Sequence, residues 1–454
     1  MAERKVTRLA MKLHSYVYTR HYKVGLALLK PAPGKGGRCA MKFQVFHGWY
    51  VVLATHVLLA LIFGGAYSFG AFFSQIQANF AVGSFSVASV FSLTALIYYA
   101  MGVVAGVLAD RTSTRRVVGA GILSLALGFF CASLASGSLW WFLLCFCVLV
   151  GLGVGLVYVP AVAVVQRWFV RRRSQASGLA LAGTGVGTFA GPLLAGWLME
   201  HFSWEATLQI FAGAILLLGL GATALMRSGP QELGLFADGL PAMAERPQAA
   251  TAGLRLSEAL GMARFWWYFA AILCGSVGLF VALVHINPYA RQAGLGVSAA
   301  NLLIGLIGVG NVGGRLFLGS LGDRIGSRRL LIALTLVLVL LNLLWLVADG
   351  FMALALFALC FGVANGGCIS LYPAVAADWF GTANLGAILG ALYMSVGIAA
   401  LLGGSLAGWL FDLYQGYGAA ICLGAGCALL SVLFILLACR SLPDPLSQAA
   451  PTAA

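Results

Sequence analysis

Residues 106–116, GVLADRTSTRR, and residues 319–329, GSLGDRIGSRR, are two versions of one motif, and together they decide the fold. Each has a glycine, a leucine, an Asp-Arg pair and a final pair of arginines at the same spacing, and each follows an apolar stretch. The two aspartates, Asp110 and Asp323, occupy the same place in the two copies, nearly half a chain length apart. A motif that returns at such a distance predicts an internal duplication.

Two more pairs of segments repeat in the same order. Residues 160–169, PAVAVVQRWF, return as residues 373–380, PAVAADWF. Residues 194–200, LAGWLME, return as residues 406–412, LAGWLFD. Three pairs in one order and at nearly one separation indicate a single duplication, so the chain is predicted to consist of two halves of similar structure.

The composition places both halves in a membrane. Of the 454 residues, 61% are hydrophobic and only 9% are charged, and the mean hydropathy is +0.97. So few polar side chains cannot cover a soluble protein of this size. Apolar segments of roughly 20 residues, the length that crosses a bilayer, recur twelve times. The predicted fold class is an all-α membrane protein with twelve transmembrane helices in two pseudo-symmetric six-helix bundles.

The repeat and the apolar segments also divide the chain. The predicted parts are a basic, disordered N-terminal extension at 1–45, an N-terminal six-helix bundle at 46–226, a cytoplasmic central loop at 227–262, a C-terminal six-helix bundle at 263–440 and a disordered tail at 441–454. The extension has no apolar stretch long enough for a secretory signal. Met41 begins MKFQVFHGWYVV directly before the first predicted helix. We interpret Met41 as the true start of translation, with a targeting presequence as the alternative.

The chain has 59 glycines, many of them four residues apart, as at 102/106, 151/155, 310/314 and 386/390. This spacing allows helix backbones to approach closely. We expect most of these glycines to serve packing and some to lie where helices move against one another.

The net charge of +14 is distributed in a way that indicates topology. Ten of the 27 lysine and arginine residues precede residue 45, and the seventeen that follow are all arginine. Fifteen of the seventeen lie in the breaks after even-numbered predicted helices, whereas Arg291 lies in the opposite set. This positive-inside pattern predicts cytoplasmic termini in a plasma membrane, such as a bacterial inner membrane. A nucleic-acid partner is not expected, because the basic residues do not gather on a polar face.

The GxLxDRxxxRR motif resembles the hallmark loop of the major facilitator superfamily, and the resemblance covers nearly all of residues 46–440. Three further stretches are similar to the monocarboxylate and oxalate/formate transporter branch: HGWYVV at 47–52, WFVRRRSQASGLALAGTGVG at 168–187 and GPQELGLFADG at 229–239. The resemblance implies a secondary transporter whose solute site lies near the midplane between its halves.

The two motif copies are predicted to form gating loops on the cytoplasmic side. Their charged residues are Asp110, Arg111, Arg115 and Arg116 in the first copy and Asp323, Arg324, Arg328 and Arg329 in the second. At a helix end a carboxylate can pair with an arginine and face the positive N-terminus of a neighbouring helix. Breaking and remaking such contacts would bias the inward-facing and outward-facing states. The alternative is that the arginines only set topology.

Arg315 is the only basic residue placed well inside a predicted span. It stands eight residues before Asp323, roughly 12 Å along a helix, so one alternative is that its side chain reaches the cytoplasmic interface. An arginine within a membrane needs a partner, and a guanidinium matches a carboxylate in two-point geometry. We therefore predict that Arg315 faces a central cavity and binds an anion. The resemblance agrees, because members of the branch carry an arginine in helix 8 that contacts the substrate carboxylate.

The surroundings of Arg315 favour a substrate with one negative charge. Asn311 stands one turn earlier, where animal proton-coupled monocarboxylate carriers have an aspartate. Every acidic residue after Glu3 can be placed in a loop or at a helix end, so no carboxylate is expected deep in the membrane. Tyr67 and Tyr393 stand where the resemblance would lead one to look for further cations. One central cation suits a monocarboxylate better than oxalate.

The other candidate site residues are aromatic or titratable. Tyr67, Tyr158 and Tyr393 are expected to supply hydroxyl donors and aromatic walls to the site, with a core or interfacial position as the alternative for each. His56 and His285 are the plausible titrating groups in the predicted helices. A histidine changes charge near neutral pH, so the two are candidates for a proton-linked or gating role, set against a structural one.

The sequence thus predicts a secondary active transporter that moves a small monocarboxylate anion, similar to lactate or pyruvate, by alternating access, as proton symport or anion exchange. Two alternatives stay open: export of an unrelated solute such as a drug or metabolite, and oxalate/formate exchange. The sequence has no catalytic motif, metal-ligand spacing or cofactor-binding loop, so an enzyme is not expected. A sensor with transporter architecture is the remaining alternative. The expected partners are the lipid bilayer, the organic anion and protons, and a monomer is expected to function.

Overall fold

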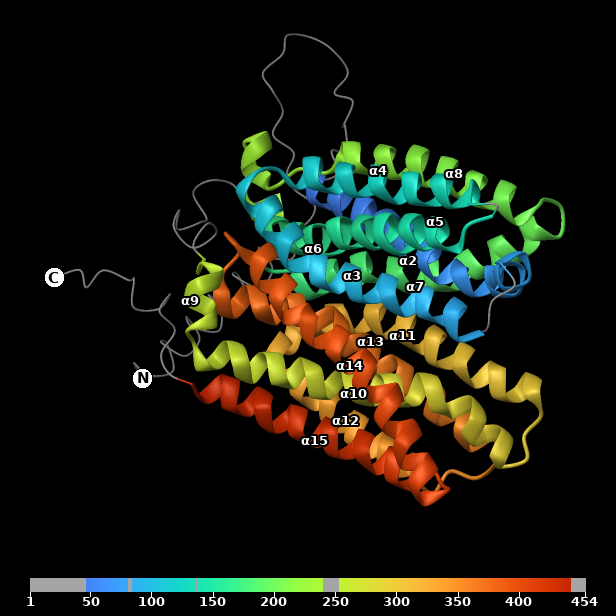
Figure 1. Ribbon diagram of the computed structural model, residues 1–454. Coiled ribbons are helices and arrows are strands. Elements are labelled where there is room, and N and C mark those ends of the chain that lie inside the picture. Colours follow the sequence, from blue (N-terminus) through green and yellow to red (C-terminus); the bar gives the residue numbers. More distant parts are fainter. Residues whose placement is uncertain (1–45, 81–83, 136, 240–252, 442–454) are drawn as a thin grey trace, which may run out of the picture. The chain divides into compact units, whose positions relative to one another are not determined.

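The computed structural model describes residues 46–80, 84–135, 137–239 and 253–441, and the regular secondary structure in these ranges is helical. The helices of the N-terminal half are α2 (His47–Phe80), α3 (Ser84–Arg111), α4 (Thr114–Ser133), α5 (Leu139–Leu143), the π-helical segment η1 (Leu144–Val150), α6 (Gly151–Trp168), α7 (Arg173–Met199) and α8 (Trp204–Leu225). Those of the C-terminal half are α10 (Ala263–Gln292), α11 (Val297–Ile325), α12 (Ser327–Trp345), α13 (Gly350–Phe380), α14 (Leu385–Tyr414) and α15 (Gly418–Arg440). Three short segments, η2 (Pro230–Leu233), η3 (Ala237–Gly239) and α9 (Leu256–Leu260), lie between the halves in sequence. Figure 1 shows these helices, coloured along the sequence from blue at the N-terminus to red at the C-terminus.

In the described part of the chain, twelve helical segments are long and apolar enough to cross a membrane. The fourth of them, Leu139–Trp168, is a continuous run of α5, η1 and α6. This confirms the predicted all-α fold with twelve spans, and the chain is an integral membrane protein. The predicted extension at 1–45 and nearly all of the predicted tail at 441–454 lie outside the described residues. The predicted domain boundaries stay predictions.

The helices expose apolar side chains, and several of their buried hydroxyl groups are bonded within the same helix. Phe189, Leu217 and Phe317 are 69%, 75% and 74% exposed, which is unfavourable in water and suits contact with lipid chains. The buried hydroxyls of Thr94 and Thr335 each donate a hydrogen bond of 2.7 Å to the backbone carbonyl four residues earlier. Because the bilayer core offers no water, this local bonding is how a hydroxyl group is accommodated within a span.

Part of the central loop is anchored on the N-terminal half. Asp238 has a left-handed backbone conformation, with φ of 56°, and its Oδ2 accepts hydrogen bonds from the backbone N–H groups of Val170 and Arg171, at 3.0 and 2.8 Å. Both donors lie in the turn between α6 and α7. The carboxylate therefore fixes the turn from which α7 begins.

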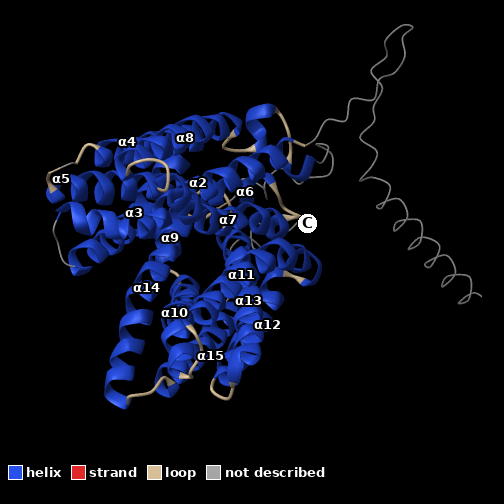
Figure 2. Cartoon of the chain, turned by 90° about the vertical axis from the view of Figure 1, so that its right-hand side faces the viewer, coloured by secondary structure: helices blue, strands red, loops and turns tan. Residues whose placement is uncertain are grey.

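The most extensive contacts between the halves are those of α3 with α14 and of α7 with α11. In Figure 2 the helices of the N-terminal half lie in the upper part and those of the C-terminal half in the lower part. Gly106 on α3 lies against the backbone of Gly386 on α14, and Gly178 on α7 lies against the carbonyl oxygen of Arg315 on α11. A methyl group at Gly106 or Gly178 would overlap the facing carbonyl oxygen. The end of the helices that carries the two motif copies is called the arginine-rich end below.

We predict that Gly106→Val lowers the thermal midpoint of the purified protein in detergent. The valine side chain would collide with the backbone of Gly386, and overpacking of this kind costs about 1–3 kcal/mol. Gly213→Val on α8 is the matched control, because no atom lies within 4 Å of the position its Cβ would take. Equal midpoints for the two variants would contradict the close contact between α3 and α14.

Candidate functional site

Arg315 lies in the interface between the two halves. It is 8% exposed, and its Nη1 donates hydrogen bonds to the carbonyl oxygen of Leu181, at 2.6 Å, and to Oγ1 of Thr184, both on α7. Its Nε is buried and has no hydrogen-bond partner among the described residues. Leu181 and Thr184 come eight and eleven residues after the start of α7, so the guanidinium stays roughly 12 Å or more from the arginine-rich end. The side chain therefore does not reach toward a headgroup region.

The periodicity of α7 explains why the hydroxyl group of Thr184 meets Arg315. Ser177, Thr184 and Thr188 share one face of the helix, because they are spaced seven and four residues apart. Val186 and Leu193, which are 42% and 60% exposed, lie on the opposite face. The apolar face is turned outward, so the hydroxyl-bearing face is turned toward the centre of the protein.

Tyr158 on α6 and Tyr393 on α14 stack across the two halves. Their ring centroids are 5.5 Å apart and their planes differ by 18°. Both tyrosines, together with Tyr67 on α2, lie within electrostatic range of the Arg315 guanidinium. The Tyr393 hydroxyl is buried and has no hydrogen-bond partner in the described ranges, whereas Tyr67 and Tyr158 are half-buried. The structure thus brings Arg315 and the three predicted tyrosines together.

Asn311 contacts a second asparagine and not Arg315. Its Nδ2 donates a hydrogen bond of 3.1 Å to Oδ1 of Asn365 on α13, which is 2% exposed. Asn365 could not be recognised from the sequence, since it is a single asparagine in an apolar helix and belongs to no motif. Within the described residues no carboxylate lies at ion-pair distance from Arg315. The central cation is therefore bonded to neutral oxygen atoms.

The two predicted histidines make backbone contacts inside separate halves. Nδ1 of His56 lies 2.8 Å from the carbonyl oxygen of Leu179, which joins α2 to α7. Nε2 of His285 lies 3.1 Å from the carbonyl oxygen of Gly404, and its ring centroid is 5.7 Å from that of Tyr417. These contacts hold each ring against its own bundle, and the geometry of both histidines fits the structural alternative.

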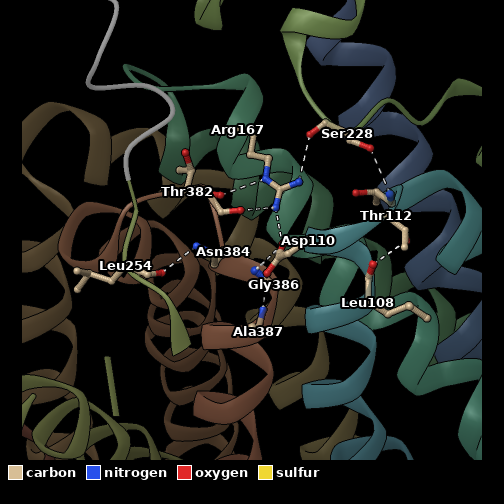
Figure 3. A network of polar contacts seen from close by, with 12 residues as sticks. Leu108, Asp110, Thr112, Arg167, Ser228, Leu254, Thr382, Asn384, Gly386 and Ala387 are labelled. Atoms are coloured by element: carbon tan, nitrogen blue, oxygen red, sulfur yellow. Dashed lines mark hydrogen bonds and ion pairs between the residues drawn. The ribbon is translucent and has the colours of Figure 1, made fainter. Parts of the chain in front are cut away.

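Asp110 closes the arginine-rich end of the α3–α14 pair (Figure 3). Its carboxylate accepts hydrogen bonds from the backbone N–H groups of Gly386 and Ala387, at 3.3 and 2.8 Å, in the first turn of α14. Arg167 at the end of α6 forms an ion pair with Asp110 and donates to the carbonyl oxygen of Thr382 at 3.1 Å. A negative charge at a helix N-terminus is favourable, so this network holds the two halves together.

Asp323 makes the corresponding contact in the α7–α11 pair. Its Oδ1 and Oδ2 accept hydrogen bonds from the backbone N–H groups of Ser174 and Gln175, at 2.8 and 3.0 Å, in the first turn of α7. Each motif aspartate therefore caps a helix of the opposite half. The two contacts differ in one respect, because among the described ion pairs there is one for Asp110 and none for Asp323.

The arginines of the motif are not the partners of its aspartates. Five of them are exposed: Arg111, Arg115, Arg116, Arg324 and Arg329. Arg328 lies with its guanidinium carbon 5.5 Å from the ring centroid of Trp379, within its own half. These positions fit the alternative in which the motif arginines set topology.

Three of the four residues in the described ion pairs at the arginine-rich end lie outside the repeated Asp-Arg motif: Arg167, Arg173 and Asp378. Arg167 pairs with Asp110, and Arg173 pairs with Asp378 at 2.8 Å, which joins α7 to α13. The duplication carried a usable signal, because Arg167 and Asp378 both directly precede the Trp-Phe pair of their repeat copy. Arg167 and Asp378 carry opposite charges at matching positions of the two repeat copies, and each forms an ion pair with another residue at the junction.

The central arrangement contains groups suited to binding a ligand. It offers one buried guanidinium, tyrosine hydroxyl groups and aromatic faces. Across the described ranges, no group of three histidine, cysteine or acidic residues is placed to hold a metal ion. A guanidinium and hydroxyl groups are donors that suit an anion.

Comparison with known proteins agrees with the fold and the motifs. The family model of the Major Facilitator Superfamily matches residues 55–348 and 288–453. Monocarboxylate transporter 13 of Bos taurus is 30% identical over 89% of this chain and 91% of its own length, and monocarboxylate transporter 12 of Rattus norvegicus is 28% identical over 83% and 82%. The crystal structure of the E. coli fucose:proton symporter, at 16% identity, matches 85% of this chain and 98% of its own with a TM-score of 0.66, which supports the fold.

We predict that Asp323→Ala opens the arginine-rich end. The reporter is Ser177→Cys in a protein whose native cysteines have been replaced, because Ser177 is 1% exposed and lies on the inward face of α7. Two hydrogen bonds to a charged group are lost, each worth about 1.5–3 kcal/mol, so we expect the rate of maleimide labelling of Cys at this position to rise about tenfold or more.

Two controls define what a different result would mean. Asp412 lies at the opposite end of α14, so Asp412→Ala should leave the labelling rate unchanged. Asp378→Asn breaks a partly exposed ion pair with side chains 15% and 35% exposed, which contributes about 0–1 kcal/mol, so it should change the rate less than Asp323→Ala does. Equal rates in all variants would show that Asp323 does not hold the closed state.

Proposed function

The chain belongs to the major facilitator superfamily, in its monocarboxylate transporter branch, and we propose that it carries a small organic monocarboxylate across the membrane by alternating access. The observation that supports this most directly is Arg315, a buried guanidinium at the junction of the halves without a carboxylate partner among the described residues. An unneutralised cation in a membrane is unfavourable. A carboxylate substrate supplies the missing charge.

The hydrogen bonds of Arg315 indicate how binding would be coupled to movement. Nη1 is bonded to α7 of the other half, while Nε has no partner in the described part of the chain. A carboxylate oxygen at Nε would thus share one guanidinium with the interface between the halves. Substrate binding then redistributes the hydrogen bonds that join α7 to α11, which is the differential contact that alternating access requires.

The contacts between the halves support a gate at the arginine-rich end. Asp110 and Asp323 hold the first turns of α14 and α7, and Arg173 pairs with Asp378. The positive-inside pattern supports a cytoplasmic location for this end and for both termini, in a plasma membrane such as a bacterial inner membrane. Movement of solute toward the cytoplasm would require these contacts between the halves to separate.

One central charge supports a monocarboxylate over oxalate. The positions at which a second cation would be sought are occupied by Tyr67 and Tyr393, which contribute hydroxyl groups without charge. Coupling is proposed as proton symport or anion exchange. Because Asp110 and Asp323 are engaged at the arginine-rich end, a symported proton would be carried by a histidine or by the carboxyl group of the substrate.

We predict that Arg315→Ala lowers the uptake of radiolabelled lactate and pyruvate into proteoliposomes by about 100-fold. The substrate carboxylate would lose its two-point contact with the guanidinium, in which each hydrogen bond contributes about 1.5–3 kcal/mol. Arg315→Lys keeps the charge without the planar donors and should retain a small part of the uptake. Arg291→Ala, an exposed arginine at the opposite end, is the control and should transport normally.

The same vesicles distinguish the two coupling modes. Stimulation by an inward proton gradient indicates symport, and stimulation by unlabelled acid on the far side indicates exchange. Uptake of no monocarboxylate by the wild-type protein, or uptake that is the same with Arg315→Ala, would contradict the proposal.

A further inference from the structure

Six aromatic rings from both halves form a continuous cluster beside Arg315. Its members are Phe63 and Tyr67 on α2, Tyr98 and Tyr99 on α3, Tyr158 on α6 and Tyr393 on α14. Phe63 is the hub, because its centroid lies 6.2 Å from that of Tyr67, 6.3 Å from that of Tyr98 and 5.2 Å from that of Tyr158. The apolar part of a short acid, with one or two carbon atoms beyond the carboxylate, would contact only a small part of this aromatic cluster.

The cluster extends into the C-terminal half. The Tyr98 and Tyr99 centroids are 4.3 Å apart, and the ring of Tyr99 lies against the backbone of Gly397 on α14. Tyr158 stacks on Tyr393. The rings therefore lie where α14 meets the N-terminal half, and Tyr158 and Tyr393 lie within electrostatic range of Arg315.

Several of the rings keep part of their surface accessible. Phe63, Tyr67, Tyr99 and Tyr158 are only half-buried, although their ring partners lie on neighbouring helices of the bundle. Phe63 carries no polar atom, so its accessible surface can be covered favourably only by an apolar group. Aromatic pairs also contribute about 0.5–1.5 kcal/mol beyond the area that they bury.

Two polar groups accompany the aromatic cluster. Nε of Arg315 and the hydroxyl group of Tyr393 are buried and have no partner among the described residues, and each residue is more than nine-tenths buried. The junction therefore has an anion-binding pole, formed by Nε of Arg315 and the hydroxyl group of Tyr393, and an aromatic pole, formed by Phe63 and Tyr158. A ligand that matches both has one carboxylate and one flat apolar ring.

We propose that the substrate class is aromatic monocarboxylates, held by a carboxylate on Arg315 and a ring against Phe63 and Tyr158. This rests on the proposed function, since it assumes that Arg315 binds the carboxylate. A short acid such as pyruvate offers the same head group without a ring, so it uses only the anion-binding pole.

The test compares acids that differ only by a phenyl ring. Pyruvate with phenylpyruvate, and lactate with phenyllactate, are titrated into the purified full-length protein, and their Kd values are measured by calorimetry. Contact of the ring with several aromatic side chains predicts that each phenyl acid binds at least about tenfold more tightly than its parent, a ratio equal to about 1.4 kcal/mol. In Phe63→Leu and Tyr158→Leu this ratio should fall toward one.

The control is Phe189→Leu, a 69% exposed aromatic on α7, in which the ratio should stay at the wild-type value. Thermal midpoints of all variants are measured first, and Tyr158→Leu serves if Phe63→Leu does not fold. Equal Kd values for an acid and its phenyl derivative in the wild-type protein would overturn the inference and leave the proposed function standing. Binding of none of the four acids would overturn the proposed function itself, and the inference with it.

Discussion

The carboxylates of Asp110 and Asp323 each cap the first turn of a helix in the opposite half, and the arrangement of the central residues depends on these two contacts. They draw α14 against α3 and α7 against α11, and glycines at both junctions allow the backbones to meet. Because α7 is held in this position, Leu181 and Thr184 reach the guanidinium of Arg315. The same approach of α14 brings Tyr393 onto Tyr158.

The centre of the protein combines groups that a membrane core rarely holds together. A buried cation, a buried tyrosine hydroxyl group without a partner among the described residues and a set of half-buried rings lie where the two halves meet. A packed apolar core would be more stable than this arrangement, because unpartnered polar groups are unfavourable in a medium without water. These groups at the junction are the ones that the proposed transport of an amphipathic anion would use.

Much of the fold could be predicted from the sequence, because hydropathy and a repeat act over long stretches. The twelve spans and the twofold organisation needed only the apolar segments and three pairs of repeated motifs. Arg315 was also recognisable, since a lone cation inside a span has few structural explanations. The partners were harder to predict. Arg167, Asp378 and Asn365 are assigned by which helices meet, and Phe63 differs from other apolar residues only by its neighbours.

Because each motif aspartate caps a helix of the opposite half, the residues at the junction depend on both halves. Gly106 and Gly386 come from different halves, as do Asp323 and the first turn of α7. A side chain acquired at one of these positions must therefore be matched by a change in the other half, far away along the chain. Chimeras that join one half of this protein to the other half of a relative would inherit mismatched junctions, even though each half is a complete bundle of helices. Successful exchange would have to follow the helix pairs and not the boundary between the repeats.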